Sequence, residues 1–264
     1  MPFVETRAGT LCYQDHGDGP LIVLLHATLH DHHDFDALVE RLEPDYRLVT
    51  LDWPGCGLSA PATEPAKLSA TLFADALEDL VDHLAVPSLC IVGNSVGGFA
   101  AARLALTRPQ QVAGLVLVDT GGFIPMTTPT RLFCKAMGTP WITRLALPTF
   151  ARLYMKPTSS LDHEILERVV SRARTSAGVQ QAAALWRSFA RDDSDLRSRA
   201  AQLVTPTLIV WGLRDRAIPV SAGRATHAVI PNSRFEVLDT GHVPFASAPE
   251  EFLALAEPFL RSVT

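Results

Sequence analysis

The sequence of 264 residues lacks any apolar stretch of the roughly 20 residues that a transmembrane helix requires. Its opening, MPFVETRAGT, lacks the basic segment and following apolar segment of a secretory signal peptide, so we expect none. Positive charge is not in excess either, because the net charge is -5 and the pI is near 6.0. Internal repeats and low-complexity tracts are also missing. We therefore expect a cytoplasmic protein with no membrane span and no nucleic-acid partner.

Cysteine is scarce, and the spacing of the four residues does not match that of metal ligands. They are Cys12, Cys56, Cys90 and Cys134. Cys90 lies in an apolar run and is expected to be a small core residue. We predict that all four are reduced thiols, as is usual in the cytoplasm.

Apolar residues are plentiful, at 47% of the chain, which is enough for one large core with a modest insert. Short apolar runs that predict strands alternate with amphipathic segments that predict helices. The predicted strands are 21–27, 46–53, 88–93, 113–119, 206–212 and 233–240, after an opening hairpin. The predicted helices are 34–42, 69–84, 95–106 and 249–263. This alternation predicts an α/β fold, with a mostly parallel sheet covered by helices on both faces.

Residues 121–200 interrupt this alternation, because they contain helical patterns and no convincing strand. They hold 12 Lys and Arg against 6 Asp and Glu, whereas the remainder holds 11 against 22. We predict that 121–200 form a helical cap, or lid, inserted into a core made of 1–120 and 201–264.

One serine is flanked by glycines between a predicted strand and a predicted helix. Gly93-Asn94-Ser95-Val96-Gly97 matches the pattern G-x-S-x-G, which in this context places a nucleophile on a sharp turn. The flanking glycines remove side chains that would collide at such a turn. We therefore predict that Ser95 is a catalytic nucleophile, although a glycine-rich strand–helix connection could show the same pattern.

A serine hydroxyl requires a base, which in this topology is a histidine oriented by an acid in the chain order Ser, Asp, His. Asp215 follows one predicted strand and His242 follows the last. Active groups gather where parallel strands end, so we predict a triad of Ser95, Asp215 and His242. Asp119 also ends a strand and is the second choice for the acid.

A tetrahedral intermediate carries an oxyanion that needs preorganised N–H donors. Val96 follows the nucleophile, and Thr28 lies in the loop after the first buried strand. We predict that their N–H groups form the oxyanion hole.

These motifs together resemble the α/β-hydrolase superfamily over nearly the whole chain except the cap. The matching segments are His26-Ala27, 52–59 (DWPGCGLS), 93–98 (GNSVGG), Trp211-Gly212 with Asp215 and Pro219, and Gly241-His242 with Pro244. The resemblance implies an eight-stranded core with a cap between strands six and seven, and no cofactor. A serine nucleophile argues against the haloalkane dehalogenase and epoxide hydrolase branches, which use aspartate.

Two positions depart from the pattern of the superfamily. Ala27 stands where glycine is usual, and alanine tolerates positive φ poorly, so the oxyanion loop could be arranged differently. Ser247 stands where an acidic residue is frequent, a position that we interpret as structural.

The favoured function is hydrolysis of carboxylic esters of small to medium apolar substrates, such as acyl or aryl esters. Gly-Asn-Ser-x-Gly-Gly also occurs in meta-cleavage product hydrolases, which cut carbon–carbon bonds in ring-opened dienoates. A ligand-binding or signalling protein on a hydrolase fold is a third possibility. A metal-dependent hydrolase is a fourth.

Three further features admit a plain structural interpretation. The segment 30–34 (HDHHD) resembles part of a metal site, but we interpret it as the polar start of a helix, with one histidine able to touch substrate. Arg168, Arg172 and Arg174 are interpreted as a solvated helix face. The large apolar residues of 121–200 are expected to pack together, with a few lining a pocket; they are Phe133, Met137, Trp141, Phe150, Tyr154, Met155, Trp186 and Phe189.

Overall fold

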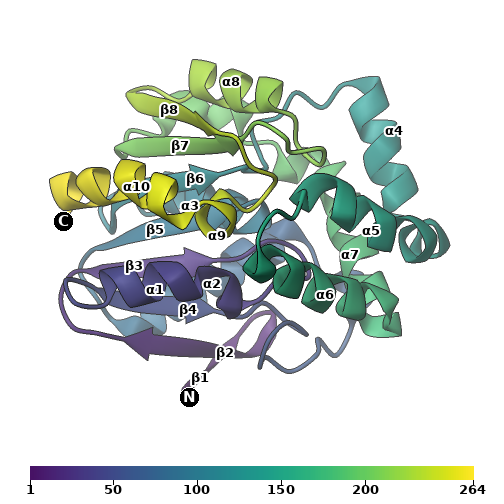
Figure 1. Cartoon of the computed structure of the whole chain (residues 1–264), viewed down its shortest axis with the longest axis horizontal. Coiled ribbons are helices and arrows are strands. Elements are labelled where there is room, and N and C mark those ends of the chain that lie inside the picture. The colour runs from purple at the N-terminus through teal and green to yellow at the C-terminus, as the bar shows by residue number, and fades with distance from the viewer.

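The computed structural model describes residues 1–264 and contains one sheet of eight strands in the order β1-β2-β4-β3-β5-β6-β7-β8 (Figure 1). The pairs β1–β2 and β2–β4 are antiparallel, and all the others are parallel. The strands are β1 (Phe3–Thr6), β2 (Gly9–His16), β3 (Leu21–Leu25), β4 (Arg47–Leu51), β5 (Leu89–Asn94), β6 (Val112–Val118), β7 (Thr207–Gly212) and β8 (Ser233–Leu238). The predicted α/β class, the opening hairpin and the eight strands implied by the resemblance are confirmed.

Helices cover both faces of this sheet, as the alternation of patterns predicts. Those of the core are α1 (Asp36–Leu42), α2 (Ala70–Leu84), α3 (Val96–Thr107), α8 (Val220–Val229), α9 (Pro244–Ser247) and α10 (Pro249–Val263). The helix predicted over 34–42 begins at Asp36 as α1, and a short 3-10 helix, η1 (His32–Phe35), precedes it. Asp31 caps η1 by accepting the His33 N–H, so this polar segment is a helix start.

The alternation of side chains along β3 shows how the two faces are filled. Leu21, Val23 and Leu25 pack in a cluster with residues of α2 and α3. Ile22 and Leu24 point the other way, into a cluster with residues of α1 and α10. Both sets are buried, as expected for a parallel strand between two helical layers.

The last strand differs from this expectation, because β8 is only partly buried on either face. It lies at the edge of the sheet and has β7 as its single neighbour. An edge strand has less cover from neighbouring elements, which explains the exposure of Ser233–Leu238.

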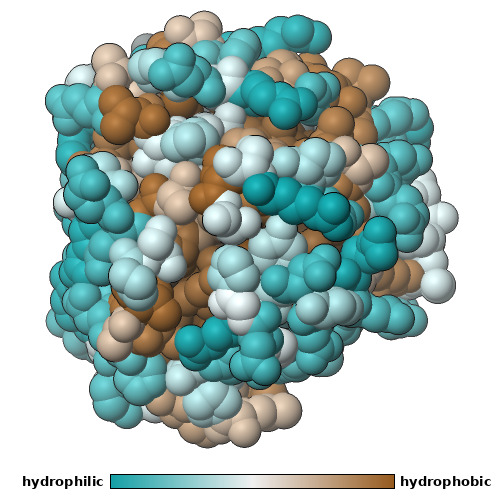
Figure 2. All heavy atoms as spheres, turned by 90° about the vertical axis from the view of Figure 1, so that its left-hand side faces the viewer, coloured by the Kyte–Doolittle hydropathy of each residue, from teal (hydrophilic) through white to brown (hydrophobic).

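Four α-helices lie between β6 and β7 in the chain: α4 (Thr128–Met137), α5 (Pro140–Met155), α6 (Ser160–Arg174) and α7 (Ser176–Phe189). They are called the inserted helices below, and they lie to the right of the sheet in Figure 1, beyond the ends of the parallel strands. Figure 2 shows the opposite end of the molecule, where hydrophobic and hydrophilic residues are interspersed. No helix is both long enough and apolar enough to cross a membrane.

All four cysteines are free and buried. Cys90 lies on β5 within the core, as the apolar run around it predicts. Burial raises the pKa of its thiol to about 12, so the reactive thiolate form is suppressed.

Candidate active site

Ser95 lies on a strained turn between β5 and α3. Its φ of 55° and ψ of -113° are unfavourable for a residue with a side chain. The turn packs too closely for larger neighbours, because a Cβ at Gly97 would lie 2.4 Å from the carbonyl oxygen of Leu25. The Ser95 N–H donates to the Val118 carbonyl at 3.0 Å, which ties the turn to β6. Backbone geometry therefore holds the Ser95 side chain at the end of the sheet.

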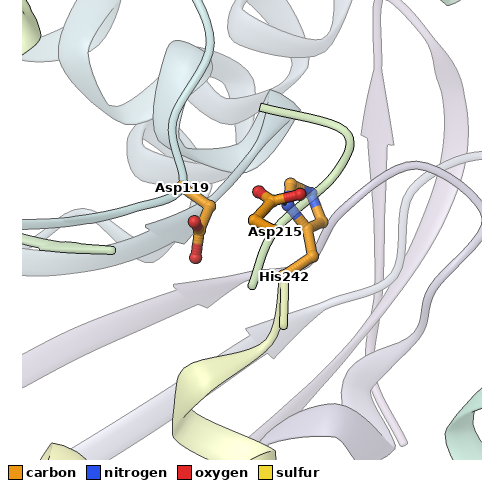
Figure 3. Close-up of side chains that lie close together, drawn as sticks. All are labelled: Asp119, Asp215 and His242. Atoms are coloured by element: carbon orange, nitrogen blue, oxygen red, sulfur yellow. The ribbon is translucent and has the colours of Figure 1, made fainter. Parts of the chain in front are cut away.

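His242 and Asp215 are hydrogen-bonded, with 2.6 Å between Nδ1 of the imidazole and Oδ2 of the carboxylate (Figure 3). The other carboxylate oxygen of Asp215 accepts the N–H groups of Ala217, at 2.6 Å, and Ile218, at 3.1 Å. These donors hold the carboxylate in place. The Asp215 carboxylate accepts a hydrogen bond from Nδ1–H of His242, which leaves Nε2 free to act as a base. The same two groups, with Asp119, could ligate a metal, but Nδ1 and Oδ2 already bind each other.

Ser95 and His242 line the same cavity, together with Thr28. The Ser95 hydroxyl forms no hydrogen bond within the protein, and the direct contact between Ser95 and His242 therefore stays a prediction. Catalytic hydrogen bonds are often long in unliganded enzymes and tighten when substrate binds.

The loop after β3 approaches Ser95 as the oxyanion prediction requires. Ala27, Thr28 and Leu29 all line the cavity, and the Thr28 N–H donates to no protein acceptor. Val96 is the first residue of α3, so its N–H has no partner within that helix. The residue with positive φ in this loop is Leu29, at 66°, and Ala27 is not strained. Alanine in place of the usual glycine at position 27 therefore does not require a positive φ in this loop.

A buried histidine stabilises this loop from behind. His26 Nδ1 lies 2.7 Å from the Ala27 carbonyl oxygen, and Nε2 accepts the Trp53 N–H at 3.1 Å. Burial lowers the pKa of His26, which favours the neutral ring that this pair of hydrogen bonds needs. The match of His26 to the superfamily therefore corresponds to a structural role.

The cavity has a volume of about 640 Å³ and receives most of its aromatic lining from the inserted helices. Five of the eight large apolar residues named in the sequence line it: Phe133, Phe150, Tyr154, Trp186 and Phe189. Met137 and Met155 are buried elsewhere, and Trp141 is 67% exposed. Sequence alone could not separate these groups, since all lie in amphipathic helices.

The prediction of a solvated arginine face is wrong for two of its three residues. Arg172 forms an ion pair with Asp31 and donates to the Leu29 carbonyl at 2.6 Å. Arg168 lies 3.2 Å from the same carboxylate. Only Arg174 is exposed. These contacts join α6 to the loop that carries Thr28, which the sequence could not indicate because the partners are far apart along the chain.

We expect Asp31→Asn to lower the free energy of unfolding by about 2 kcal/mol at pH 7. Burial alone would raise the pKa of Asp31, but Arg172 and Arg168 outweigh it and lower the pKa from 3.8 to about 2. The ionised carboxylate therefore stabilises the fold above pH 3.8, and this contribution is lost as the pH falls toward 2. Urea unfolding at pH 7 and pH 3 should show the difference between wild type and variant shrinking.

The matched control is Asp36→Asn, which removes an exposed carboxylate from the start of α1. This control should remain within about 0.5 kcal/mol of wild type at either pH. Equal stability of wild type and Asp31→Asn at pH 7 would show that the ion pair with Arg172 contributes nothing.

None of the histidines of 30–34 lines the cavity, contrary to the suggestion that one touches substrate. His30 lies 2.5 Å from Asp34 through Nδ1 and 3.2 Å from the Tyr154 hydroxyl through Nε2. His32 is hydrogen-bonded to Asp52 at 2.7 Å. Burial would lower the pKa of His32, but this carboxylate raises it. These contacts join η1 and the residue His30 before it to α5 and to Asp52, which follows β4.

The sequence analysis named Tyr154 and Asn94 but predicted no contact of either residue with His242. The Tyr154 carbonyl accepts the His242 N–H at 3.0 Å, and the two rings pack edge to face at 5.2 Å. The Asn94 side chain donates to the carbonyls of His242, at 3.0 Å, and Val118, at 3.1 Å. Asn94 therefore holds the His242 loop and does not line the cavity. No sequence signal distinguishes Tyr154 from the other aromatic residues of α5.

Ser247 has the structural role that the sequence suggested. Its hydroxyl donates to Asp162 at 2.7 Å, and Asp162 belongs to the capping box that begins α6. The contact joins α9, just after His242, to an inserted helix.

Comparisons with known proteins agree with this fold. The family model described as alpha/beta hydrolase fold matches residues 20–249. The chain is 34% identical to 2-hydroxy-6-oxononadienedioate/2-hydroxy-6-oxononatrienedioate hydrolase 2 of Pseudomonas putida, over 98% of this chain and 96% of the relative. A thermophilic esterase from Thermogutta terrifontis superimposes with a TM-score of 0.83 and 25% identity, over 99% of this chain and 98% of that one. A meta-cleavage product hydrolase from Pseudomonas fluorescens shares the fold, with a TM-score of 0.74 and 20% identity over 100% and 98% of the two chains.

Proposed function

Because the chain belongs to the α/β-hydrolase family and is a hydrolase, we propose that it cleaves carboxylic esters of small to medium apolar substrates. Ser95 is the nucleophile, His242 the base and Asp215 the acid that orients His242. The inserted helices act as a cap that provides the apolar wall of the site. The observation that carries this proposal is the hydrogen bond of 2.6 Å between Asp215 and His242, a residue that lines the same cavity as Ser95.

Acylation begins when Nε2 of His242 takes the Ser95 hydroxyl proton as the oxygen attacks the ester carbonyl. Asp215 stabilises the imidazolium that forms. The N–H groups of Thr28 and Val96 hold the negative oxygen of the tetrahedral intermediate. His242 then returns the proton to the alkoxide, which leaves as the alcohol, and the acyl group remains on Ser95.

Deacylation repeats these steps with water in place of the serine. His242 takes a proton from water, the hydroxide attacks the acyl carbonyl, and Ser95 recovers its proton as the acid leaves. Every proton that moves passes through the imidazole, so no cofactor is needed in this scheme.

A second candidate, carbon–carbon bond hydrolysis of an oxo-dienoate, is favoured by the relative from Pseudomonas putida. Such a dicarboxylate needs cationic partners, and most arginines near the cavity are already paired. Arg131 lies 3.4 Å from Asp192, and Arg191 lies 2.7 Å from Asp193. Arg216 is the exposed lining arginine that forms no ion pair, so it would be the anchor for a substrate carboxylate.

A substrate panel tests the choice between these reactions. We expect the highest kcat/KM for p-nitrophenyl esters with acyl chains of about four to eight carbons, because an apolar cavity of this size accommodates them. Turnover of a ring-opened oxo-dienedioate should be at least about a hundredfold lower, since two carboxylates would lose their hydration without enough cations in return.

Other results of the panel would favour the alternatives. Faster turnover of the dienedioate, with a KM raised by Arg216→Ala for that substrate and not for esters, would establish the carbon–carbon reaction. Tight binding with negligible turnover would indicate a ligand-binding or signalling protein. Loss of all activity on addition of a chelator would indicate a metal-dependent hydrolase.

A further inference from the structure

Two buried carboxyl groups, and not one, approach His242. One carboxylate oxygen of Asp119, one of Asp215 and one ring nitrogen of His242 lie within 4.8 Å of one another, and Figure 3 shows the three side chains close together, with Asp215 next to the imidazole. Asp119 follows the end of β6 and is fully buried, and Asp215 is 3% exposed. Neither forms an ion pair with an arginine or lysine. The imidazole of His242 is therefore the one group that can balance their charge.

The hydrogen-bond donors are divided unequally between the two carboxyl groups. Asp215 receives the imidazole and the N–H groups of Ala217 and Ile218. Asp119 receives a single backbone N–H, from Gly212, at 3.0 Å from one oxygen and 3.3 Å from the other. Donors favour the ionised form, so this geometry stabilises a negative charge on Asp215 better than on Asp119. Burial, and then the charge of Asp215, raise the pKa of Asp119 well above its usual range.

We propose that Asp119 and Asp215 form a carboxyl pair that carries one proton between them, in which Asp119 is a second positioning acid for His242. In the wild type the neutral Asp119 leaves Asp215 as the single carboxylate beside the imidazole. Replacing Asp215 with a smaller side chain removes this like charge and also opens space for water beside Asp119, which lessens the burial that is the larger cause of its raised pKa. Asp119 then releases its proton to solvent and becomes the carboxylate that orients His242. This inference rests on the proposed roles of Ser95 and His242.

Comparison of two substitutions at one position tests the pair. Asp215→Asn keeps the shape of the side chain but presents an NH₂ group to Nδ1, which enforces the wrong tautomer and costs about 10⁴-fold in rate. Asp215→Ala leaves an empty space between Asp119 and the imidazole ring. The Asp119 carboxylate can then accept a hydrogen bond from Nδ1–H of His242, either directly or through a water molecule. We therefore expect Asp215→Ala to be faster than Asp215→Asn by at least about tenfold, although asparagine is the closer mimic.

The readout is phosphonylation of Ser95 by diisopropyl fluorophosphate, followed by mass spectrometry. The Ser95 oxygen bonds to phosphorus, fluoride leaves, and the serine proton passes to His242. Labelling therefore reports the serine and its base without reference to the natural substrate. When Asp119→Asn is added to Asp215→Ala, the rate of Ser95 labelling should fall to that of Asp215→Asn. Asp239→Asn, an exposed carboxylate three residues before His242, is the matched control and should label at the wild-type rate.

The inference is overturned if Asp215→Ala labels no faster than Asp215→Asn, or if Asp119→Asn has no effect in the Asp215→Ala background. Thermal unfolding of each variant verifies that the compared proteins are folded. If Asp215→Ala does not fold, Asp215→Ser replaces it under the same criteria. If the wild type is labelled at Ser95 but hydrolyses no ester, the proposed ester substrates are wrong. The labelling rates of the variants then still test the carboxyl pair. Wild type that is not labelled at Ser95 would overturn both.

Discussion

Ser95→Ala should lower kcat for p-nitrophenyl butyrate by about a millionfold, to the small residual rate that binding and the oxyanion donors provide. The substitution removes the atom that forms the acyl bond, and no neighbouring group can replace it. The fold should be unaffected, because the hydroxyl makes no hydrogen bond within the protein and the strain of the turn lies in its backbone. Steady-state kinetics with active-site titration of the wild type gives the ratio.

The matched control is Ser262→Ala, which removes an exposed hydroxyl from the last turn of α10, outside the residues that line the cavity. It should hydrolyse the ester at the wild-type rate. If Ser95→Ala keeps more than about one thousandth of the wild-type kcat, the covalent mechanism is wrong.

Gly241→Ala should lower kcat/KM by at least a hundredfold, because it displaces the loop that carries His242. A Cβ at position 241 would lie 1.9 Å from the Met155 carbonyl oxygen and 2.6 Å from that of Tyr154. Both carbonyls belong to backbone at the end of α5, so they cannot turn aside as a flexible side chain would. The loop must move away from α5, and a displacement of about 1 Å at a catalytic base costs roughly a hundredfold.

The same substitution should lower the free energy of unfolding by roughly 1–3 kcal/mol, as overpacking in a closed site does. Asp239→Ala, two residues earlier in the same loop, exchanges an exposed side chain and should leave both kinetics and stability close to wild type. A Gly241→Ala enzyme with wild-type kinetics would show that α5 does not fix the position of His242. Urea unfolding and ester kinetics on the same preparations separate the two effects.

Local sequence was sufficient to predict the residues of the proposed triad. Ser95 stands out because a strained turn between a strand and a helix needs glycine on both sides. Asp215 and His242 stand out because parallel strands bring their ends to one edge of the sheet. The choice between Asp119 and Asp215 also agrees with the contact that His242 makes, since its Nδ1 lies 2.6 Å from Asp215.

The sequence could not reveal how the inserted helices meet the core. Arg168 and Arg172 lie on α6 at a spacing that fits a solvated face equally well. Asp31, their partner, lies 141 residues from Arg172 in the chain. Tyr154 likewise resembles the other aromatic residues of its helix, although its carbonyl binds the His242 N–H.

The amino-acid pattern by itself determined the sheet, its helical layers and the candidate nucleophile, acid and base, because each depends on periodicity or on a turn of a few residues. Tertiary structure alone decided which aromatic residues face the cavity, that α6 pairs with Asp31, and that Asp119 shares the environment of Asp215. These features depend on where elements distant in the chain pack against one another. Burial and charge then act on whichever side chains that packing brings together, and no local pattern encodes this.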